Sequence, residues 1–430
     1  MKRIAAATRF LQRGAMKTAR VFGLLIGGLW CAAPIAGHAS PDEEAMGKTQ
    51  GYPVAPKGNL VSKAPYMVGS YSAMDRLFPH CVVKAGSNPL VLKPADGTPA
   101  PRYRLNNLSF SLDDYMEHQR ATALLVLKDD QIVFERYGYD RKPSQRMLSN
   151  SMAKTIAALA IGKALEKGAI RSLDDTAARY EPRLAHSLLG ETSIRNLLRM
   201  ASGIRFDEEH DRLPSDSSRF FQSRAKMGLT RALAELNERE YPAGERFNYV
   251  SPTTMALGLV LRGATGQSVC DFVGQHLWQP MGAESDATWL IDPRDKVELT
   301  GGNFNATVRD YARLGWLLAH DGVRDGKSVI DREFLLDMTD AARQPPAFRP
   351  GAASHHGSTY FGYGYQVWLF PGGKRRFALQ GIHGQNIFVD PELRLVLVHT
   401  AVAERAGGNK AMAQELNAVW RGLVNHYGRW

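Results

Sequence analysis

Cysteine and histidine are scarce in this sequence, and neither forms a familiar metal-binding pattern. There are three cysteines and 12 histidines among 430 residues. His355 and His356 are the only adjacent histidines, and neither a His-Glu-x-x-His nor a His-x-His motif occurs. Structural zinc sites and metalloprotease helices are built on such motifs. We therefore expect no metal and no other cofactor.

Long basic runs are also missing, although positive charge is in excess. The formal net charge is +11, from 54 Lys and Arg against 43 Asp and Glu. Six of these basic residues and no acidic residue lie within positions 1–39, so only a mild excess is spread over the rest of the chain. Nucleic-acid binding proteins concentrate their basic residues in one patch or stripe. The sequence therefore does not favour a nucleic-acid partner.

No hydrophobic run near the N-terminus is long enough to span a membrane. The apolar stretch at residues 21–33 follows basic residues and is shorter than the roughly 20 residues of a spanning helix. Positions 37–39, Gly-His-Ala, are typical of a small-x-small cleavage site. We expect residues 1–39 to be a signal peptide, with Met1 or Met16 as the start. The product would then be periplasmic or secreted, without a stable membrane span; an uncleaved anchor is the alternative.

The few cysteines leave one question open. Cleavage of the signal peptide would remove Cys31 and leave Cys81 and Cys270. Two cysteines can pair in an oxidising compartment, but their spacing gives no geometry, so a disulfide and two buried thiols are both possible. With 430 residues, of which 44% are hydrophobic, the chain is too long for a small disulfide-stabilised fold and too apolar for a disordered one.

Strand patterns lie at both ends of the chain, with helical patterns between them. Apolar runs typical of strands cover Ala121–Leu127, Ile132–Tyr139, Tyr363–Phe370, Phe377–Val389 and Arg394–Thr400. An apolar stripe from Met412 to Leu423 predicts a closing helix that lies on a sheet. The pattern predicts an α+β fold of the α/β-sandwich type: one antiparallel sheet built from both chain ends and flanked by helices, with a large, mainly helical insertion at about 151–340.

Before this domain lies a segment of different composition. Residues 40–105 are rich in Pro, Gly, Ser and Lys and show weak periodicity. We expect an irregular lead-in packed over the domain that residues 106–430 form.

Ser151 and Lys154 precede an apolar run, Thr155–Ile170, that predicts a buried helix. In the first turn, a serine lies near unpaired N–H groups that stabilise negative charge. Lys154 is one turn away, and a buried lysine loses proton affinity, so its neutral amine can take the serine proton. The alternative is that Ser151 only caps a helix and Lys154 is a solvated lysine. The same spacing recurs at Ser223 and Lys226, where no buried helix follows and we expect no catalysis.

Two further elements favour a catalytic site. Tyr249-Val250-Ser251 contains the only Tyr-x-Ser in the sequence, and a tyrosinate near the lysine would serve as a base that later returns the proton. A core tyrosine with a satisfied hydroxyl is the alternative. Glycines interrupt the strand pattern of Leu379–Gln385, which often marks close approach to the backbone. A strand-edge N–H there could join that of Ser151 in binding an oxyanion.

The order Ser-x-x-Lys, Tyr-x-Ser and glycine-bearing strand resembles the serine β-lactamase and penicillin-binding-protein superfamily. The sequence is most similar to the branch of class C β-lactamases, related esterases and 6-aminohexanoate-dimer hydrolases. Further segments similar to that branch are Asn196–Ile204, Asn305–Asp310, Ala312–Gly315 and Gly381–Asn386. The resemblance covers roughly Asp113 to the C-terminus, and its last segment is most similar to the 6-aminohexanoate-dimer hydrolases.

The resemblance implies roles for individual residues. Ser151 would be the acylated nucleophile, with Lys154 and Tyr249 as the proton-transfer pair. The oxyanion and substrate-binding positions that it implies are Gly381, Ile382, His383 and Ser251. Ile382 would supply the second oxyanion N–H beside that of Ser151.

Three departures from the family bear on the substrate. Leu379-Gln380-Gly381 replaces the Lys-Thr-Gly of true β-lactamases, so the cation that meets a β-lactam carboxylate is missing. Ser251 stands where class C enzymes have Asn. Thr300 stands where an Asn is expected in a dedicated aminohexanoate amidase. These departures favour a general ester or amide substrate over a β-lactam or a nylon oligomer.

The leading interpretation is an exported serine hydrolase that cleaves a small ester or amide through a Ser151 acyl-enzyme. The alternative, from another class, is a non-catalytic or slowly acylating protein that binds cell-wall peptides or penicillin. A Gly-x-Ser-x-Gly nucleophile elbow is absent from the sequence, which disfavours a different serine hydrolase fold.

Overall fold

The computed structural model describes residues 39–96, 101–211, 213–354, 357–358, 360–406 and 410–430. Apart from Ala39, the expected signal peptide lies outside these residues, as do Cys31 and the pair His355 and His356. Within the described ranges, no helix combines the length and the apolar character needed to cross a lipid bilayer.

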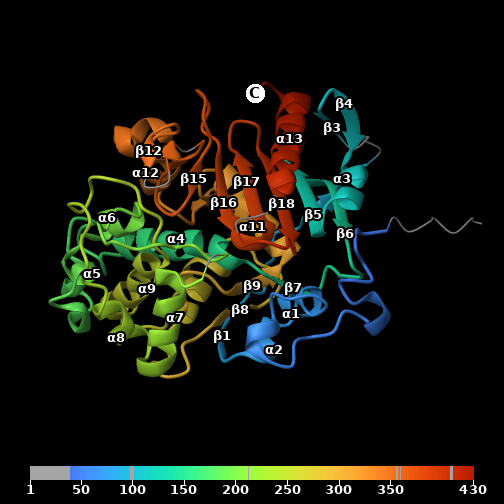
Figure 1. The fold of residues 1–430 in the computed structure, drawn as a ribbon. Helices are drawn as coiled ribbons and strands as arrows, with labels where there is room; N and C mark the ends of the chain where they lie inside the picture. The colour runs from blue at the N-terminus through green and yellow to red at the C-terminus, as the bar shows by residue number, and fades with distance from the viewer. Residues whose placement is uncertain (1–38, 97–100, 212, 355–356, 359, 407–409) are drawn as a thin grey trace, which may run out of the picture. The chain divides into compact units, whose positions relative to one another are not determined.

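A sheet of eight strands joins the two ends of the described chain (Figure 1). In spatial order the strands are β14 (Gly362–Tyr363), β15 (Trp368–Leu369), β16 (Phe377–Gly381), β17 (Gln385–Asp390), β18 (Leu395–Ala401), β5 (Ala121–Lys128), β6 (Gln131–Tyr137) and β2 (Lys93–Pro94). Neighbouring strands are antiparallel except β2 and β6. β18 pairs with β5, so that Val398 lies opposite Leu125. The predicted α+β class, with a sheet assembled from both chain ends, is confirmed.

Helices cover both faces of this sheet, which explains why β5 is buried along almost its whole length. The covering helices are α3 (Leu112–His118) and α13 (Lys410–Tyr427) on one face and α11 (Val308–Ala319) on the other. Leu124 and Val126 pack with α3 and α13, whereas Leu125 and Leu127 belong to the core that includes α11. Successive side chains of a strand point to opposite faces. One continuous apolar run therefore serves two cores.

Residues 151–340 contain most of the helices, as expected, but also strands of a second sheet. The further helices of this region are α4 (Ala153–Glu166), α5 (Leu188–Glu191), α6 (Ile194–Leu198), α7 (Asp216–Met227), α8 (Leu229–Ala234), α9 (Ser251–Thr265), α10 (Val269–Val273) and α12 (Arg332–Thr339). The second sheet has the order β1 (His80–Val83), β8 (Ala287–Leu290), β9 (Phe304–Thr307) and β7 (Arg146–Leu148). Two short hairpins are β10 (Val323–Arg324) with β11 (Lys327–Ser328), and β12 (Ala353–Ser354) with β13 (Gly357–Ser358). β8 and β9 are buried at every position, so they lack the alternation that identifies a strand, and the sequence analysis missed them.

The segment 40–105 is less irregular than its composition predicts. It contains α1 (Met67–Tyr71), α2 (Met74–Leu77) and β3 (Arg102–Leu105), which pairs with β4 (Leu108–Ser111), besides β1 and β2. β1 pairs with β8 and β2 pairs with β6, so the segment supplies an edge strand to each sheet. Strands this short show no recognisable period in the sequence. The expectation of an irregular lead-in is corrected for these stretches.

Residues 377–389, expected as one strand with glycines near its centre, form two antiparallel strands. β16 ends at Gly381 and β17 begins at Gln385, and these two residues lie opposite each other. The chain reverses between them, where His383 has φ of 60° and Gly384 has φ of 90°. The glycines therefore mark a tight turn and not the interior of a strand.

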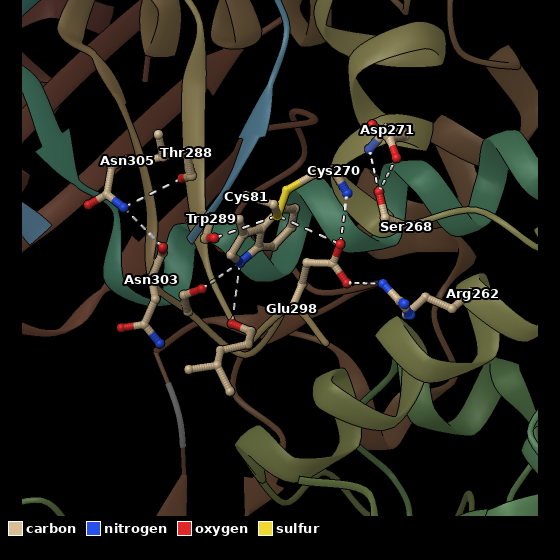
Figure 2. Close-up of a disulfide and its surroundings, with 12 residues drawn as sticks. Cys81, Arg262, Ser268, Cys270, Asp271, Thr288, Trp289, Glu298, Asn303 and Asn305 are labelled. Carbon is tan, nitrogen blue, oxygen red and sulfur yellow. Dashed lines mark hydrogen bonds and ion pairs between the residues drawn. A yellow bond between two sulfur atoms is a disulfide. The ribbon is translucent and has the colours of Figure 1, made fainter. Parts of the chain in front are cut away.

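A disulfide joins Cys81 of β1 to Cys270 of α10, 189 residues further along the sequence (Figure 2). Cys81 lies opposite Trp289 in the pairing of β1 with β8. The Glu298 carboxylate lies beside the bond and accepts hydrogen bonds from the Cys270 N–H at 3.2 Å and from Arg262 Nη1 at 2.9 Å. The disulfide thus ties the edge of the second sheet to the helical region and answers the pairing question.

Replacing both cysteines, as Cys81→Ala with Cys270→Ala, is expected to lower the free energy of unfolding by about 2–4 kcal/mol, because the bond restricts a long loop of the unfolded chain. Urea unfolding followed by circular dichroism measures the difference. Wild-type protein unfolded without reductant should show no reactive thiol beyond that of Cys31. Two further thiols that react with Ellman's reagent would contradict the disulfide.

Candidate active site

Ser151 lies in a short 3-10 turn, Asn150–Met152, that leads directly into α4. α4 is the predicted apolar helix, and every residue from Ala153 to Gly162 is buried. Asn150 has φ of 45°, so the chain turns sharply just before the serine. Ser151 itself is only half-buried. The serine is therefore held at the entrance of a core helix while still open to small molecules.

Lys154 lies in the core beside this serine. Its side-chain nitrogen donates a hydrogen bond to Ser151 Oγ at 2.8 Å and another to the Gly301 carbonyl oxygen. The residue is 1% exposed, so the alternative of a solvated lysine is wrong. Burial lowers the pKa of Lys154 to about 8, and the negative charge of Glu208 opposes part of this shift. A substantial fraction of the amine is therefore neutral near physiological pH.

Tyr249 completes a group of three side chains around the Ser151 hydroxyl. Its phenol is hydrogen-bonded to Ser151, and Lys154 Nζ lies 5.0 Å from the centre of its ring. Trp368 stacks on Tyr249 with ring centres 5.5 Å apart. Burial raises the pKa of Tyr249 above its ordinary value, and the charge of Glu208 adds to this increase. The hydrogen bond with Ser151 lowers the pKa and offsets part of the increase. The raised pKa favours the phenol form of Tyr249 at neutral pH, whereas the sequence-based hypothesis expected a tyrosinate.

The turn after β16 lies against the backbone of the serine. A Cβ on Gly381 would lie 2.4 Å from the Ser149 carbonyl oxygen and 3.0 Å from the Ser151 nitrogen, so only glycine fits there. The Asn150 side chain holds the turn as well, because its Nδ2 donates to the Ile382 carbonyl oxygen at 3.0 Å. Two backbone segments are thus fixed side by side, which is the arrangement that a backbone oxyanion hole requires.

His383, for which the resemblance implies a substrate-binding position, is hydrogen-bonded to the segment 403–406. Its Nδ1 is hydrogen-bonded to the Ala403 carbonyl oxygen at 2.7 Å, and its backbone N–H donates to the Ala406 carbonyl oxygen at 3.0 Å. The ring packs edge-on to Tyr71 at 5.9 Å. The buried imidazole therefore stabilises the turn. The backbone of His383 has a positive φ because the chain reverses at this residue.

Ser251 begins α9, two residues after Tyr249, and its polar groups are bound to a carboxylate that sequence reasoning missed. The Ser251 N–H donates to Glu208 Oε2 at 2.9 Å, and its hydroxyl donates to Glu208 Oε1. Glu208 belongs to no motif; its only signal in the sequence is the run of three acidic residues at 207–209. Ser251 therefore contacts the site through Glu208, and its hydroxyl is engaged.

The second Ser-x-x-Lys copy lies on α7. Ser223 is half-buried and Lys226 is exposed, and the intervening Arg224 forms an ion pair with Asp292 at 3.0 Å. This copy therefore lacks the buried amine found at Lys154.

Possible metal ligands come together at one other place among the described residues. Cys81, Cys270 and Glu298 have ligand atoms within 4.8 Å of one another. Both sulfur atoms belong to the disulfide, so this group is not a thiolate metal site.

Two cavities differ in their relation to the site. One of about 160 Å³ adjoins the turn after β16, with Gln380, Gly381 and Asn386 among its lining residues. A larger one, of about 990 Å³, lies between β3 and α13 and is not lined by Ser151, Lys154 or Tyr249. Cavity size therefore does not point to the group formed by Ser151, Lys154 and Tyr249.

Residues 111–418 match the beta-lactamase family, and the chain belongs to that family. It is 26% identical over 362 residues to the 6-aminohexanoate-dimer hydrolase of Paenarthrobacter ureafaciens, over 78% of this chain and 85% of that protein. A solved Bacillus anthracis structure, provisionally named a 6-aminohexanoate-dimer hydrolase, has a TM-score of 0.75 at 21% identity, over 87% of this chain and 98% of that one. A family VIII carboxylesterase has a TM-score of 0.55 at 16% identity, over 71% of this chain and 93% of that one.

These comparisons confirm the family resemblance that the motifs indicated. The chain is an enzyme of the serine hydrolase class within the beta-lactamase family. The solved structures, at low identity, support the fold.

If Ser151 is the nucleophile that the sequence predicts, Gly381→Ala is expected to slow its reaction with a fluorophosphonate by about 10²-fold or more, because the methyl group forces the turn away from the Ser151 backbone and weakens a backbone oxyanion hole. Labelling rates measured by mass spectrometry check this. Gly373→Ala is the matched control, since nothing lies within 4 Å of its added Cβ. Equal labelling rates in both variants would show that the close approach is not needed.

Proposed function

We propose that the protein is an exported serine hydrolase that cleaves a small ester or amide through an acyl-enzyme on Ser151. The observation that supports this most strongly is the buried Lys154 amine, 2.8 Å from Ser151 Oγ. Among the described residues its hydrogen-bond partners are neutral oxygens, so the amine can lose its proton without breaking an ion pair.

In the proposed acylation step, Ser151 Oγ forms a bond to the substrate carbonyl carbon while its proton passes to Lys154 Nζ. The resulting oxyanion accepts hydrogen bonds from the N–H groups of Ser151 and Ile382. Collapse of this intermediate breaks the bond to the alcohol or amine, which takes a proton from the Tyr249 phenol, and Lys154 then restores the phenol proton. Water releases the acid by the same steps in reverse order. No metal or cofactor takes part in this scheme.

The surroundings support a substrate with an apolar part. Phe247, Tyr249, Tyr363 and Trp368 form a connected aromatic group with ring centres 4.7–6.5 Å apart. Leu379, the first residue of Leu379-Gln380-Gly381, takes the place of the lysine that would meet a β-lactam carboxylate. The relative that cleaves the 6-aminohexanoate dimer, as its name states, acts on a linear amide. We therefore favour linear esters and amides over β-lactams.

Export is supported by two independent features. The first 39 residues have the composition of a signal peptide. The disulfide between Cys81 and Cys270 is of a kind that persists in oxidising compartments. A periplasmic or secreted location agrees with both.

Ser151→Ala should abolish covalent labelling by a fluorophosphonate and turnover of short-chain p-nitrophenyl esters, because the nucleophile is gone. Ser223→Ala, the matched change in the second Ser-x-x-Lys copy, should leave both unchanged. Peptide mass mapping locates the label. A label on Ser223 would refute the assignment of the nucleophile, and a stable label on Ser151 without turnover would favour the slowly acylating binding protein.

The rate of Ser151 acylation should depend on pH through Lys154. Only the neutral amine accepts a proton, so kcat/KM should rise about tenfold per pH unit below the pKa of about 8 and level off above it. Lys154→Arg, which keeps the charge at every pH, should lower kcat/KM by about 10²–10⁴-fold, whereas Lys226→Arg should not. A flat profile from acid to alkaline pH would exclude Lys154 as the base.

A further inference from the structure

We propose that Glu208 is a positioning residue of this site, which holds the Tyr249 segment against Ser151 and Lys154 and acts on the lysine amine through its charge. This inference rests on the proposed function of Ser151 and Lys154.

Both carboxylate oxygens of Glu208 are committed to the start of α9. One accepts the Ser251 N–H at 2.9 Å and the other accepts the Ser251 hydroxyl. α9 has 15 residues, and its N-cap residue, Val250, has no side-chain group to bind the first N–H groups. Helices are normally capped by a polar side chain at that place, and negative charge is favourable there. Glu208 therefore caps α9 from 43 residues earlier in the chain.

This cap fixes the position of the phenol. Tyr249 lies two residues before Ser251, so a shift in the first turn of α9 moves its backbone. The same two segments are joined again where the Asn248 N–H donates to the Met200 carbonyl oxygen at 2.9 Å and Asn248 Nδ2 donates to the Ile204 carbonyl oxygen at 3.3 Å. On the C-terminal side of Tyr249, the Val250 N–H donates to Met200 Sδ at 3.4 Å and Ser251 binds Glu208.

Charged and titratable groups face Glu208 from each element around it. The charge of Glu208 acts to raise the pKa of Lys154 from α4, Tyr249 from the segment before α9 and Tyr363 from β14. For Lys154 it opposes the larger effect of burial, which lowers the pKa. On its own loop, His210 Nε2 lies 3.6 Å from Glu208 Oε1. The Glu208 side chain is 11% exposed, so water screens its charge only in part. The carboxylate thus limits how far burial weakens the lysine as a base.

The pairing also requires a hydrogen-bond donor at position 251. A carboxylate is an acceptor only, so its partner must be a donor. The Ser251 hydroxyl, with the backbone N–H of the same residue, offers two donors at the spacing of one carboxylate. The departure from asparagine noted in the sequence is therefore matched by an acid in the facing loop.

The test measures kcat and kcat/KM for a short-chain p-nitrophenyl ester as a function of pH. The variants at position 208 separate the effect of the charge from the effect of the geometry. Glu208→Gln keeps an oxygen acceptor but removes the charge that raises the pKa of Lys154. The acid limb, which is the part of the profile where kcat/KM rises with pH, should therefore move to lower pH by about one unit, and kcat should fall several-fold. Glu208→Asp keeps the charge, so its acid limb should stay at the wild-type pH while kcat falls. The control, Glu209→Gln, changes the exposed neighbour and should match wild type in both.

An acid limb of Glu208→Gln that coincides with wild type would overturn the proposal. If circular dichroism shows that Glu208→Gln does not fold, Ser251→Ala takes its place: it should lower kcat without moving the acid limb, and an unchanged kcat would overturn the positioning role. Fluorophosphonate labelling separates the two proposals. If the wild-type protein is labelled at Ser151, the proposed function is supported even when the Glu208 variants behave like wild type. If the wild-type protein is not labelled there, both the proposed function and the role of Glu208 are refuted.

Discussion

The site depends on the burial of one amine. Lys154 is inserted into the core at the first turn of α4, where its nitrogen is hydrogen-bonded to the Ser151 hydroxyl and the Gly301 carbonyl oxygen and faces the Tyr249 ring. A charged group that forms no ion pair is costly to bury. Because burial disfavours the charged form, the neutral amine becomes accessible near physiological pH, although the charge of Glu208 offsets part of this effect. The tight packing of α4 is therefore part of the proposed chemistry as well as of the fold.

The groups around this amine come from widely separated parts of the chain. The main sheet places the end of β16 beside the backbone of Ser151. The loop at 200–208 holds the Tyr249 segment in place. Trp368 of β15 closes the site by stacking on the phenol. These surrounding groups are positioned by different tertiary contacts, so the site depends on the whole domain.

The sequence was sufficient to predict those elements whose residues show a recognisable periodicity or spacing within a short stretch of the chain. The hairpin of β5 and β6, the stripe of α13 and the serine and lysine before α4 follow from periodicity and spacing. β8 and β9 were missed because strands buried on both faces lose alternation. The mostly apolar run at 363–370, which is interrupted by Gln366, divides into β14 and β15. Glu208 was missed because its role arises only when a distant helix start lies against it.

The pairing of β18 with β5 has a consequence for when activity arises. Ser151, Lys154 and Tyr249 leave the ribosome well before residues 377–401, yet the turn that faces the Ser151 backbone belongs to that last stretch. A nascent or truncated chain would contain all three reactive side chains and still lack the second partner for the oxyanion. In the proposed mechanism, hydrolysis is thereby linked to completion of the polypeptide, and a protease that removes the C-terminal strands inactivates the enzyme without touching its nucleophile.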